Sequence, residues 1–340
     1  MKKFENQMKV FFLVLLATVL NGCTSSINIK YQDALSQNKA DKNKQTHFNK
    51  KQKYIQEKSI NKAKKKSGCH SYYENYNFSK VDIKKGYNWQ LIWSDEFNEG
   101  GQPNPEKWTY AEGYRRNDAQ SCYTLRPKNV RVENGCLVLE AHKEQYPNSN
   151  YKKGSKHKLE QQFAKYTSGR LKSENKFDFT YGKVDIRAKV KSGSGAWSQL
   201  SVINSKHDTL SWPYCGEMLM MAYTGQLQNS FVTTVFSGKS RWDCRVYGEK
   251  MDNDFNVWSM EWDECELRFY FNGELYQLIK KDEDLGKDLK YWPFDQQFCL
   301  YLDLIIGGRW SPVIDDKIFP VKMQVDYIRV YKDGNSKNKK

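Results

Sequence analysis

The chain has 340 residues and a formal charge of +15, an excess of lysine that by itself would suggest a nucleic-acid partner. The charge is concentrated in the flanks: residues 1–23 carry +2, residues 24–68 carry +9 and residues 332–340 carry +3, which leaves +1 for residues 69–331. A folded part that is nearly neutral argues against a basic groove, so no nucleic-acid partner is expected.

The N-terminus has the organisation of an export signal. Lysines precede an apolar run from Val10 to Leu20, which is too short to cross a hydrocarbon layer of about 30 Å as a helix. The following "VLNGC" resembles the lipobox of bacterial lipoproteins, in which Cys23 becomes the lipidated N-terminus. The sequence predicts a signal peptide over 1–22 and lipid attachment to the outer membrane, on its periplasmic or its outer side. The alternative is an ordinary cleaved signal followed by a soluble protein.

Residues 23–68 are predicted to form a flexible tether. The segment is rich in Lys, Asn, Gln and Ser and poor in aliphatic residues, so it cannot bury enough apolar area to form a core. Its lysines could contact anionic lipid head groups, or it could be a plain spacer. Residues 333–340 are predicted to be a disordered basic tail. Seven cysteines remain beside Cys23, an odd number, so at least one thiol stays free or pairs between chains, and no Cys/His spacing suggests zinc.

From about residue 87 onward the pattern has the two-residue period of β-strands. In "GKVDIRAKV", residues 182–190, four apolar side chains alternate with charged ones. Asn134-Gly135 and Asn272-Gly273 each separate two such strands, and this dipeptide favours a two-residue hairpin turn because both positions take positive φ. No segment has a sustained helical stripe. The sequence predicts one all-β domain over 69–332, a two-sheet antiparallel β-sandwich of the jelly-roll kind, whose exposed aromatics could stack on sugar rings.

Several segments resemble glycoside hydrolase family 16, and its laminarinase-like β-1,3-glucanases most closely. Among them are "WQLIWSDEFN" at 89–98, "WPYCGE" at 212–217 and "FPVKMQVDYIRVYK" at 319–332. The match covers nearly all of residues 87–332 in the order that the family has. The resemblance implies a concanavalin-like jelly roll with a concave glycan cleft, and it makes a polysaccharide, in particular a β-glucan, the expected partner.

The catalytic strand of the family departs from its pattern here. That strand reads Glu, any residue, Asp, any two residues, Glu, and the additional residue forms a bulge. Glu217 matches the nucleophile, whereas Leu219 stands for the Asp and Ala222 for the acid/base Glu. A retaining glycosidase needs two carboxyl groups about 5 to 5.5 Å apart, and proton donation typically contributes about 10² to 10⁴ in rate. Alanine cannot donate a proton, so Glu217 is predicted to be a vestigial nucleophile.

Further substitutions surround this strand. Ser201 stands where the family has a second Trp, Phe236 where it has a cleft His, and Asp303 where it has Asn. The resemblance places other residues in the cleft, and Asp303 and Arg309 are local novelties beside them. The predicted glycan-binding residues are Arg187, Trp197, Trp212, Asp303, Arg309 and Trp310.

Three functions follow from these residues. The leading interpretation is a lipoprotein that binds a β-glucan-like polysaccharide without cutting it, a pseudoenzyme. The second is an active retaining endo-β-glucanase in which Asp303, Asp243 or Glu249 supplies the displaced acid. The third is a structural or assembly lipoprotein whose more apolar cleft binds an envelope protein.

No cofactor is required for these functions, but the resemblance implies a structural calcium ion on the convex side. Its carboxylate ligands would be Glu96 and Asp326, and oxygen ligands of this kind suit Ca²⁺. The alternative is two surface carboxylates without a metal.

Overall fold

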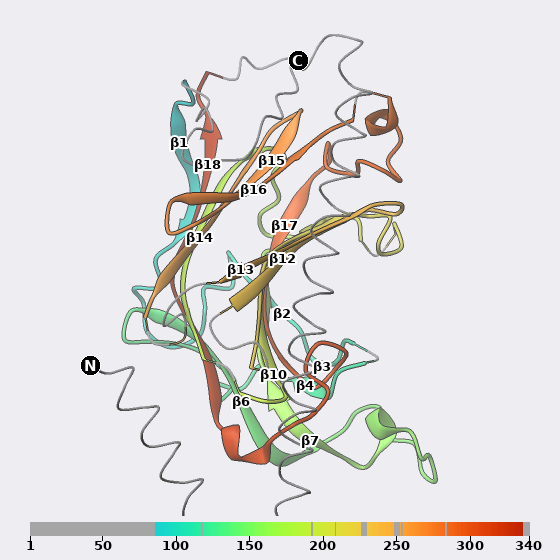
Figure 1. The fold of residues 1–340 in the computed structure, drawn as a ribbon. Helices are drawn as coiled ribbons and strands as arrows, with labels where there is room; N and C mark the ends of the chain where they lie inside the picture. The colour runs from blue at the N-terminus through green and yellow to red at the C-terminus, as the bar shows by residue number, and fades with distance from the viewer. Residues whose placement is uncertain are drawn as a thin grey trace, which may run out of the picture. The chain divides into compact units, whose positions relative to one another are not determined.

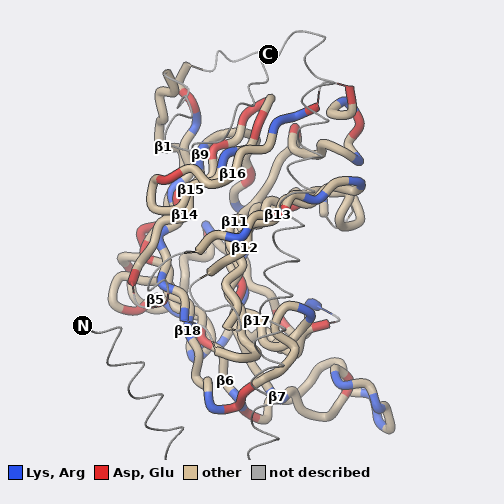
Figure 2. Tube along the Cα trace, in the orientation of Figure 1, with Lys and Arg blue, Asp and Glu red and all other residues tan. Residues whose placement is uncertain are grey.

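The computed structural model describes residues 86–335, except 117, 192, 208, 226–229, 248–251, 253 and 283. The predicted signal peptide, the lipidation site at Cys23, the tether and the start of the domain at residue 69 lie outside the described residues. In the part of the chain that the structure describes, no helix is long and apolar enough to cross a membrane. Figure 2 shows basic and acidic residues interspersed along these strands, as the nearly neutral charge of the domain predicts.

Two β-sheets and three short 3-10 turns make up the described residues (Figure 1). The larger sheet contains β1 (Trp89–Asp95), β3 (Gly113–Tyr114), β4 (Ser121–Tyr123), β5 (Val130–Glu133), β6 (Cys136–Pro147), β7 (Phe163–Ser168), β9 (Gly182–Val190), β14 (Asn256–Trp262), β15 (Glu266–Phe271), β16 (Glu274–Lys280) and β18 (Val321–Asp333). The smaller sheet contains β2 (Thr109–Tyr110), β8 (Arg170–Lys172), β10 (Ala196–Asn204), β11 (Glu217–Thr224), β12 (Ser230–Phe236), β13 (Arg241–Tyr247) and β17 (Phe298–Ile306). The 3-10 turns are η2 (Lys158–Glu160), η3 (Leu285–Lys287) and η4 (Asp316–Ile318).

The strand orders are those of a two-sheet sandwich. The eleven-stranded sheet runs β16-β15-β14-β9-β18-β6-β7-β4-β3, with β1 paired to β18 and β5 paired to β6. The seven-stranded sheet runs β13-β12-β11-β10-β17-β8-β2. Pairing is antiparallel except between β4 and β7, which are parallel. The prediction of an all-β antiparallel jelly roll is therefore confirmed.

Both predicted hairpin turns are present. Asn134 and Gly135 have φ angles of 54° and 73° and connect β5 to β6, where Glu133 pairs with Cys136. Asn272 and Gly273 have φ angles of 50° and 84° and connect β15 to β16. Asparagine and glycine tolerate this left-handed backbone region better than other residues, which explains why the dipeptide marks both turns.

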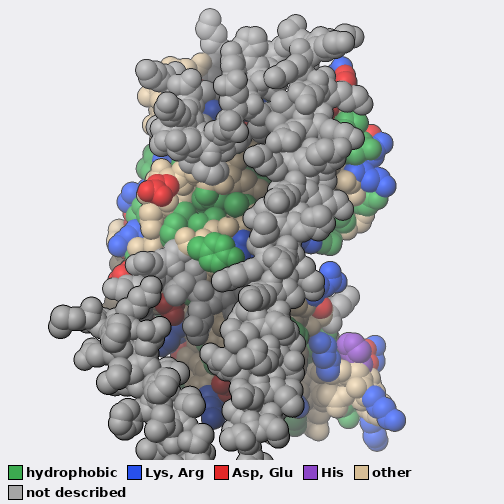
Figure 3. Space-filling model, in the orientation of Figure 1, with side chains coloured by type: hydrophobic (Ala, Val, Ile, Leu, Met, Phe, Trp, Pro, Cys, Tyr) green, Lys and Arg blue, Asp and Glu red, His purple; other side chains and the backbone are tan. Residues whose placement is uncertain are grey.

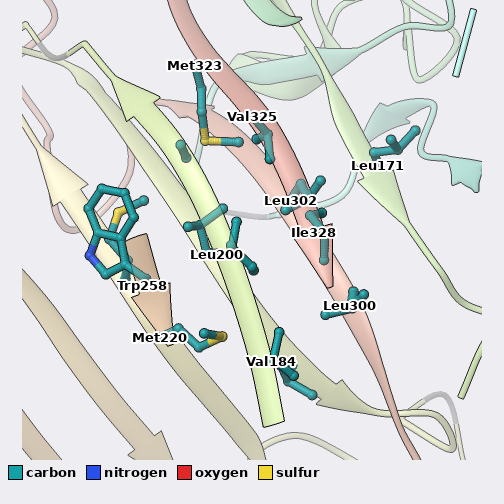
Figure 4. Close-up of a cluster of buried hydrophobic side chains, with 14 of the residues drawn as sticks. Leu171, Val184, Leu200, Met220, Trp258, Leu300, Leu302, Met323, Val325 and Ile328 are labelled. Atoms are coloured by element: carbon teal, nitrogen blue, oxygen red, sulfur yellow. The ribbon is translucent and has the colours of Figure 1, made fainter. Parts of the chain in front are cut away.

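The core lies between the two sheets. The apolar residues of β9, among them Val184 and Ile186, are fully buried and face side chains of the smaller sheet such as Leu200 and Leu302. Figure 4 shows Val184, Leu200 and Leu302 in one cluster with Ile328 of β18. Along β9 every second side chain is buried in the core, which produces the two-residue period seen in the sequence.

A β-bulge in β11 determines which residues leave the core. Between its pairs with Leu200 and Ser201 on β10, the strand contains one additional residue, Met220. Met220 and its neighbour Met221 both lie in the core. Because of the bulge, Ala222 lies on the opposite face of the sheet, as the resemblance implied.

Replacement of Leu200 by Ala should lower the free energy of unfolding by about 2–5 kcal/mol, since the side chain is fully buried between the sheets. The matched control is Leu91→Ala on β1, where the side chain is 55% exposed and the expected change is below about 0.5 kcal/mol. Urea unfolding measures both changes. Equal effects of the two substitutions would contradict this position of the core.

Candidate functional site

The face of the seven-stranded sheet that points away from the core is here called the site face. Strand pairing aligns its residues in rows: Asp303 of β17 lies opposite Gln199 of β10, which lies opposite Ala222 of β11. In another row, Ile203 of β10 lies opposite Glu217. The sheet therefore brings together residues that come from three separate segments of the sequence.

Glu217 is held at the start of β11 by two donors. The side chain is buried, Gln199 Nε2 donates to Oε1 at 2.9 Å, and Trp212 Nε1 donates to Oε2 at 3.0 Å. Burial raises the pKa of Glu217 above its ordinary value of 4.5, and this effect exceeds the opposing effect of the Trp212 hydrogen bond. Gln199 Nε2 also donates to Ser201 Oγ at 3.0 Å. Both carboxyl oxygens of the predicted nucleophile are thus engaged by the protein.

Gln199 is a site residue that the sequence analysis missed. It stands where strand alternation places a side chain on the site face, two residues after Trp197 and two before Ser201. That spacing is a signal that could have identified it. Gln199 thus pairs with Ala222 through the backbone and donates a side-chain hydrogen bond to Glu217.

The positions of the two missing carboxyl groups are apolar. Leu219 and Ala222 are 3% and 1% exposed and belong to a small hydrophobic cluster on the site face with Ala119, Trp197 and Ile305. Phe236 and Trp310 pack against this cluster. Apolar side chains therefore surround Ala222, the residue predicted from the sequence to replace the proton donor.

The proposed substitutes for the missing acid are engaged elsewhere. Asp303 is 1% exposed and accepts hydrogen bonds at Oδ2 from the guanidinium of Arg170, while its Oδ1 is buried without a hydrogen-bond partner. Asp243 accepts hydrogen bonds from Thr234 and Arg241, each at 2.8 Å. Glu249 lies outside the described residues.

The tryptophans differ in accessibility. Trp197 is only 2% exposed, because the ring of Trp310 stacks on it at 5.6 Å and the guanidinium of Arg116 lies 5.0 Å from its centroid. Its indole N–H donates to the carbonyl of Gly307. Trp212 is 56% exposed. Trp197 therefore supports the site face without offering a free ring to a ligand, and Trp212 and the half-buried Trp310 are the accessible aromatics.

Two further predicted residues lie in different surroundings. Arg309 is exposed directly beside Trp310, and its backbone N–H donates to Asp118. Arg187 lies on β9 in the larger sheet and forms an ion pair with Asp326. The prediction that Arg187 lines the same cleft as Glu217 is wrong, because its neighbours on β9 fill the core and alternation directs Arg187 to the opposite outer face.

The predicted calcium ligands line one shallow pocket on that opposite face. Arg329 donates to both oxygens of Glu96, at 2.9 and 2.7 Å, and Arg187 donates to Asp326. Among the described residues no group of three or more His, Cys, Asp or Glu side chains is arranged to hold a metal ion. The side chains here do not fit a calcium site, because each carboxylate already has a guanidinium counter-charge.

The sandwich, with its carboxylate and aromatic side chains on one outer face, defines the class of carbohydrate-active jelly rolls. The family model for glycosyl hydrolases family 16 matches residues 123–329, and the chain belongs to this family. Two curated relatives and one solved structure illustrate the similarity. A beta-glucanase of Rhodothermus marinus is 32% identical over 265 residues, which cover 73% of this chain and 87% of that protein. A keratan-sulfate endo-1,4-beta-galactosidase of Sphingobacterium multivorum is 31% identical, over 72% of this chain and 55% of that protein. The solved catalytic domain of an endo-1,3-beta-glucanase (laminarinase) of Thermotoga petrophila is 32% identical, over 74% of this chain and 100% of that chain, with a TM-score of 0.64.

Replacement of Glu217 by Gln should change how stability depends on pH. The raised pKa means that the native state binds the proton more tightly, so Glu217 destabilises the fold as pH rises above about 4.5. The Gln variant has no carboxyl group at this position, so it lacks this pH-dependent destabilisation. The unfolding temperature of the variant should therefore rise relative to the wild type as the pH increases above about 4.5. A difference that does not vary with pH would contradict the raised pKa.

Chelation of calcium should leave the unfolding temperature unchanged, because guanidinium groups already neutralise Glu96 and Asp326. Differential scanning fluorimetry with excess EGTA, and then with excess calcium, measures this. A rise with calcium that is lost in Asp326→Asn would show that the ion displaces the arginine and that the metal site exists.

Proposed function

We propose that this protein is an envelope lipoprotein that binds a β-glucan-like polysaccharide and does not cleave it. The observation that carries the proposal is the pair of positions on β11, where Ala222 stands for the proton donor and Glu217 is tied by Gln199 and Trp212. The family membership supports a carbohydrate ligand.

The local chemistry opposes hydrolysis in two ways. Cleavage of an unactivated glycosidic bond needs a proton for the leaving oxygen, and the hydrocarbon cluster around Ala222 supplies none. Attack by Glu217 needs an ionised carboxylate with a free oxygen, but burial favours the neutral form and both oxygens accept hydrogen bonds. Each of these changes alone slows the first step of a retaining mechanism, in which the leaving oxygen is protonated as the nucleophile attacks.

The same face keeps groups that suit sugar binding. Trp212 and Trp310 offer accessible ring surface, on which the C–H groups of a sugar can lie. The exposed Arg309 provides donors beside Trp310. Relatives act, by their names, on glucans and on keratan sulfate, which supports a polysaccharide ligand.

A second function is favoured by the hydrophobic cluster itself. Leu219 and Ala222 are almost fully buried, and a site face that has become apolar is compatible with a protein partner in the envelope. An active glucanase has less support, since Arg170 and Arg241 engage the two described candidate acids. The lipid anchor at Cys23 and the outer-membrane location belong to the proposal on the strength of the sequence alone.

The purified protein should bind laminarin or mixed-linkage glucan without releasing reducing ends over several days. Replacement of Trp310 or of Trp212 by Ala should weaken binding about tenfold, since each removes an accessible ring. Trp89→Ala on β1 is the matched control and should have no effect. Affinity electrophoresis measures binding, and a reducing-sugar assay measures cleavage on the same samples.

Product release that disappears in Glu217→Gln would overturn the proposal and establish an active hydrolase with a displaced acid. Failure to bind any β-glucan, together with recovery of an envelope protein on pull-down, would favour the protein-binding function.

A further inference from the structure

A pocket of about 650 Å³ lies outside the site just described. It is formed mainly by the loop between β6 and β7 and by the start of β7, with Tyr114 and Gln120 on its other side. We name it the lysine pocket. Its lining includes Lys156, Lys158, Lys165, Gln161 and Phe163.

The lysine pocket has charge of one sign. Residues 148–165 contain five lysines and a single acidic residue, Glu160. Glu160 accepts hydrogen bonds from Lys152 and Ser155, both at 2.6 Å, and does not line the pocket. No Asp or Glu is among the described residues that line it. Figure 2 shows the basic positions along the loop beside β7, and Figure 3 shows the blue side chains gathered there around a histidine. The pocket therefore favours an anion.

The loop that carries these lysines is tied by internal hydrogen bonds. Asn148 is buried and donates to the carbonyls of Leu159 and Gln161, and Gln161 Nε2 donates to the carbonyls of Ser155 and His157. Leu159 is 6% exposed and fixes η2 to the domain. A loop that is already ordered loses less conformational entropy when a ligand binds.

A single short segment connects the lysine pocket with the site face. Ala119 belongs to the hydrophobic cluster that contains Trp197, while the side chain of the next residue, Gln120, lines the lysine pocket. The backbone N–H of Gln120 donates to Ile306 at 2.7 Å, and Lys158 Nζ donates to the carbonyl of Asp118 at 3.1 Å. Ala119 and Gln120 thus lie between the hydrophobic cluster of the site face and the lysine pocket.

We propose that the lysine pocket binds an anionic substituent, a sulfate or a carboxylate, on the polysaccharide that the site face holds. This inference rests on the proposed function and specifies its ligand as a charged glycan. Three ammonium groups supply the attraction, glutamine amides can bond the hydroxyl groups, and the 41% exposed ring of Phe163 provides an apolar surface for a sugar. No carboxylate of the described residues lines the pocket, so a neutral glucan would make no use of its positive potential.

The test compares laminarin, sulfated laminarin and carboxymethyl laminarin at low ionic strength by isothermal titration calorimetry. The wild-type protein should bind at least one charged form about tenfold more tightly than the neutral form, and salt should remove the difference. The charged laminarin that binds more tightly shows whether the pocket prefers a sulfate or a carboxylate. The variant Lys156→Gln, Lys158→Gln, Lys165→Gln should lose the preference and keep its affinity for neutral laminarin.

The matched control replaces three exposed lysines outside the pocket, Lys176, Lys287 and Lys332, by Gln, with the same change of net charge. It should keep the preference. If the triple pocket variant is unstable, Lys156→Gln with Lys165→Gln keeps the hydrogen bond from Lys158 to Asp118 and serves in its place. Equal binding of neutral and charged laminarin by the wild type, or equal loss in the control, would overturn the inference.

The proposed function can fail separately. If no laminarin binds, glucose 6-sulfate and glucose are compared as fragments by saturation-transfer NMR. Binding of the sulfate alone, lost in the pocket variant, would support the lysine pocket while rejecting the β-glucan backbone. Absence of binding by either fragment would overturn the lysine pocket as well.

Discussion

The chemistry of this protein depends on one additional residue in strand β11. Without the bulge at Met220, strict alternation would direct Ala222 into the core and Met221 out of it. With it, two methionines fill the space between the sheets, and Glu217, Leu219 and Ala222 share the outer face. The backbone frame of a catalytic strand is therefore preserved even though only one of its carboxyl groups remains.

The side chains around that frame form a consistent set. Where the family has acidic groups, this sheet has a hydrophobic cluster, and Gln199 supplies a neutral partner for the carboxyl that is left. Glu217 is buried, and Gln199 and Trp212 each donate a hydrogen bond to one of its oxygens, so both oxygens keep a hydrogen-bond donor away from water. The hydrophobic cluster and the hydrogen bonds of Glu217 therefore lie on the same face of one sheet.

Charges are paired on one face of the domain, whereas another region has an excess of lysine. On the face that carries the predicted calcium ligands, arginine and carboxylate pairs compensate each other. In residues 148–165, which are the loop before β7 and the start of that strand, lysines outnumber acids five to one and leave a local excess. A domain whose net charge is close to zero can therefore still present a cationic surface beside the site face, which an average over the sequence conceals.

The sequence by itself determined the strands, both Asn-Gly turns and the bulged frame of β11, because these follow from alternation, from backbone preferences and from spacing along one strand. It also predicted that Leu219 and Ala222 replace two carboxyl groups of the family, and the structure places both among apolar side chains. Only the tertiary structure decided which sheet a strand joins and what covers its side chains. It places Arg187 in a different sheet from Glu217, and it shows that the ring of Trp310 covers Trp197. Gln199 and the lysine pocket emerged in the same way, since contacts between distant segments have no period in the sequence.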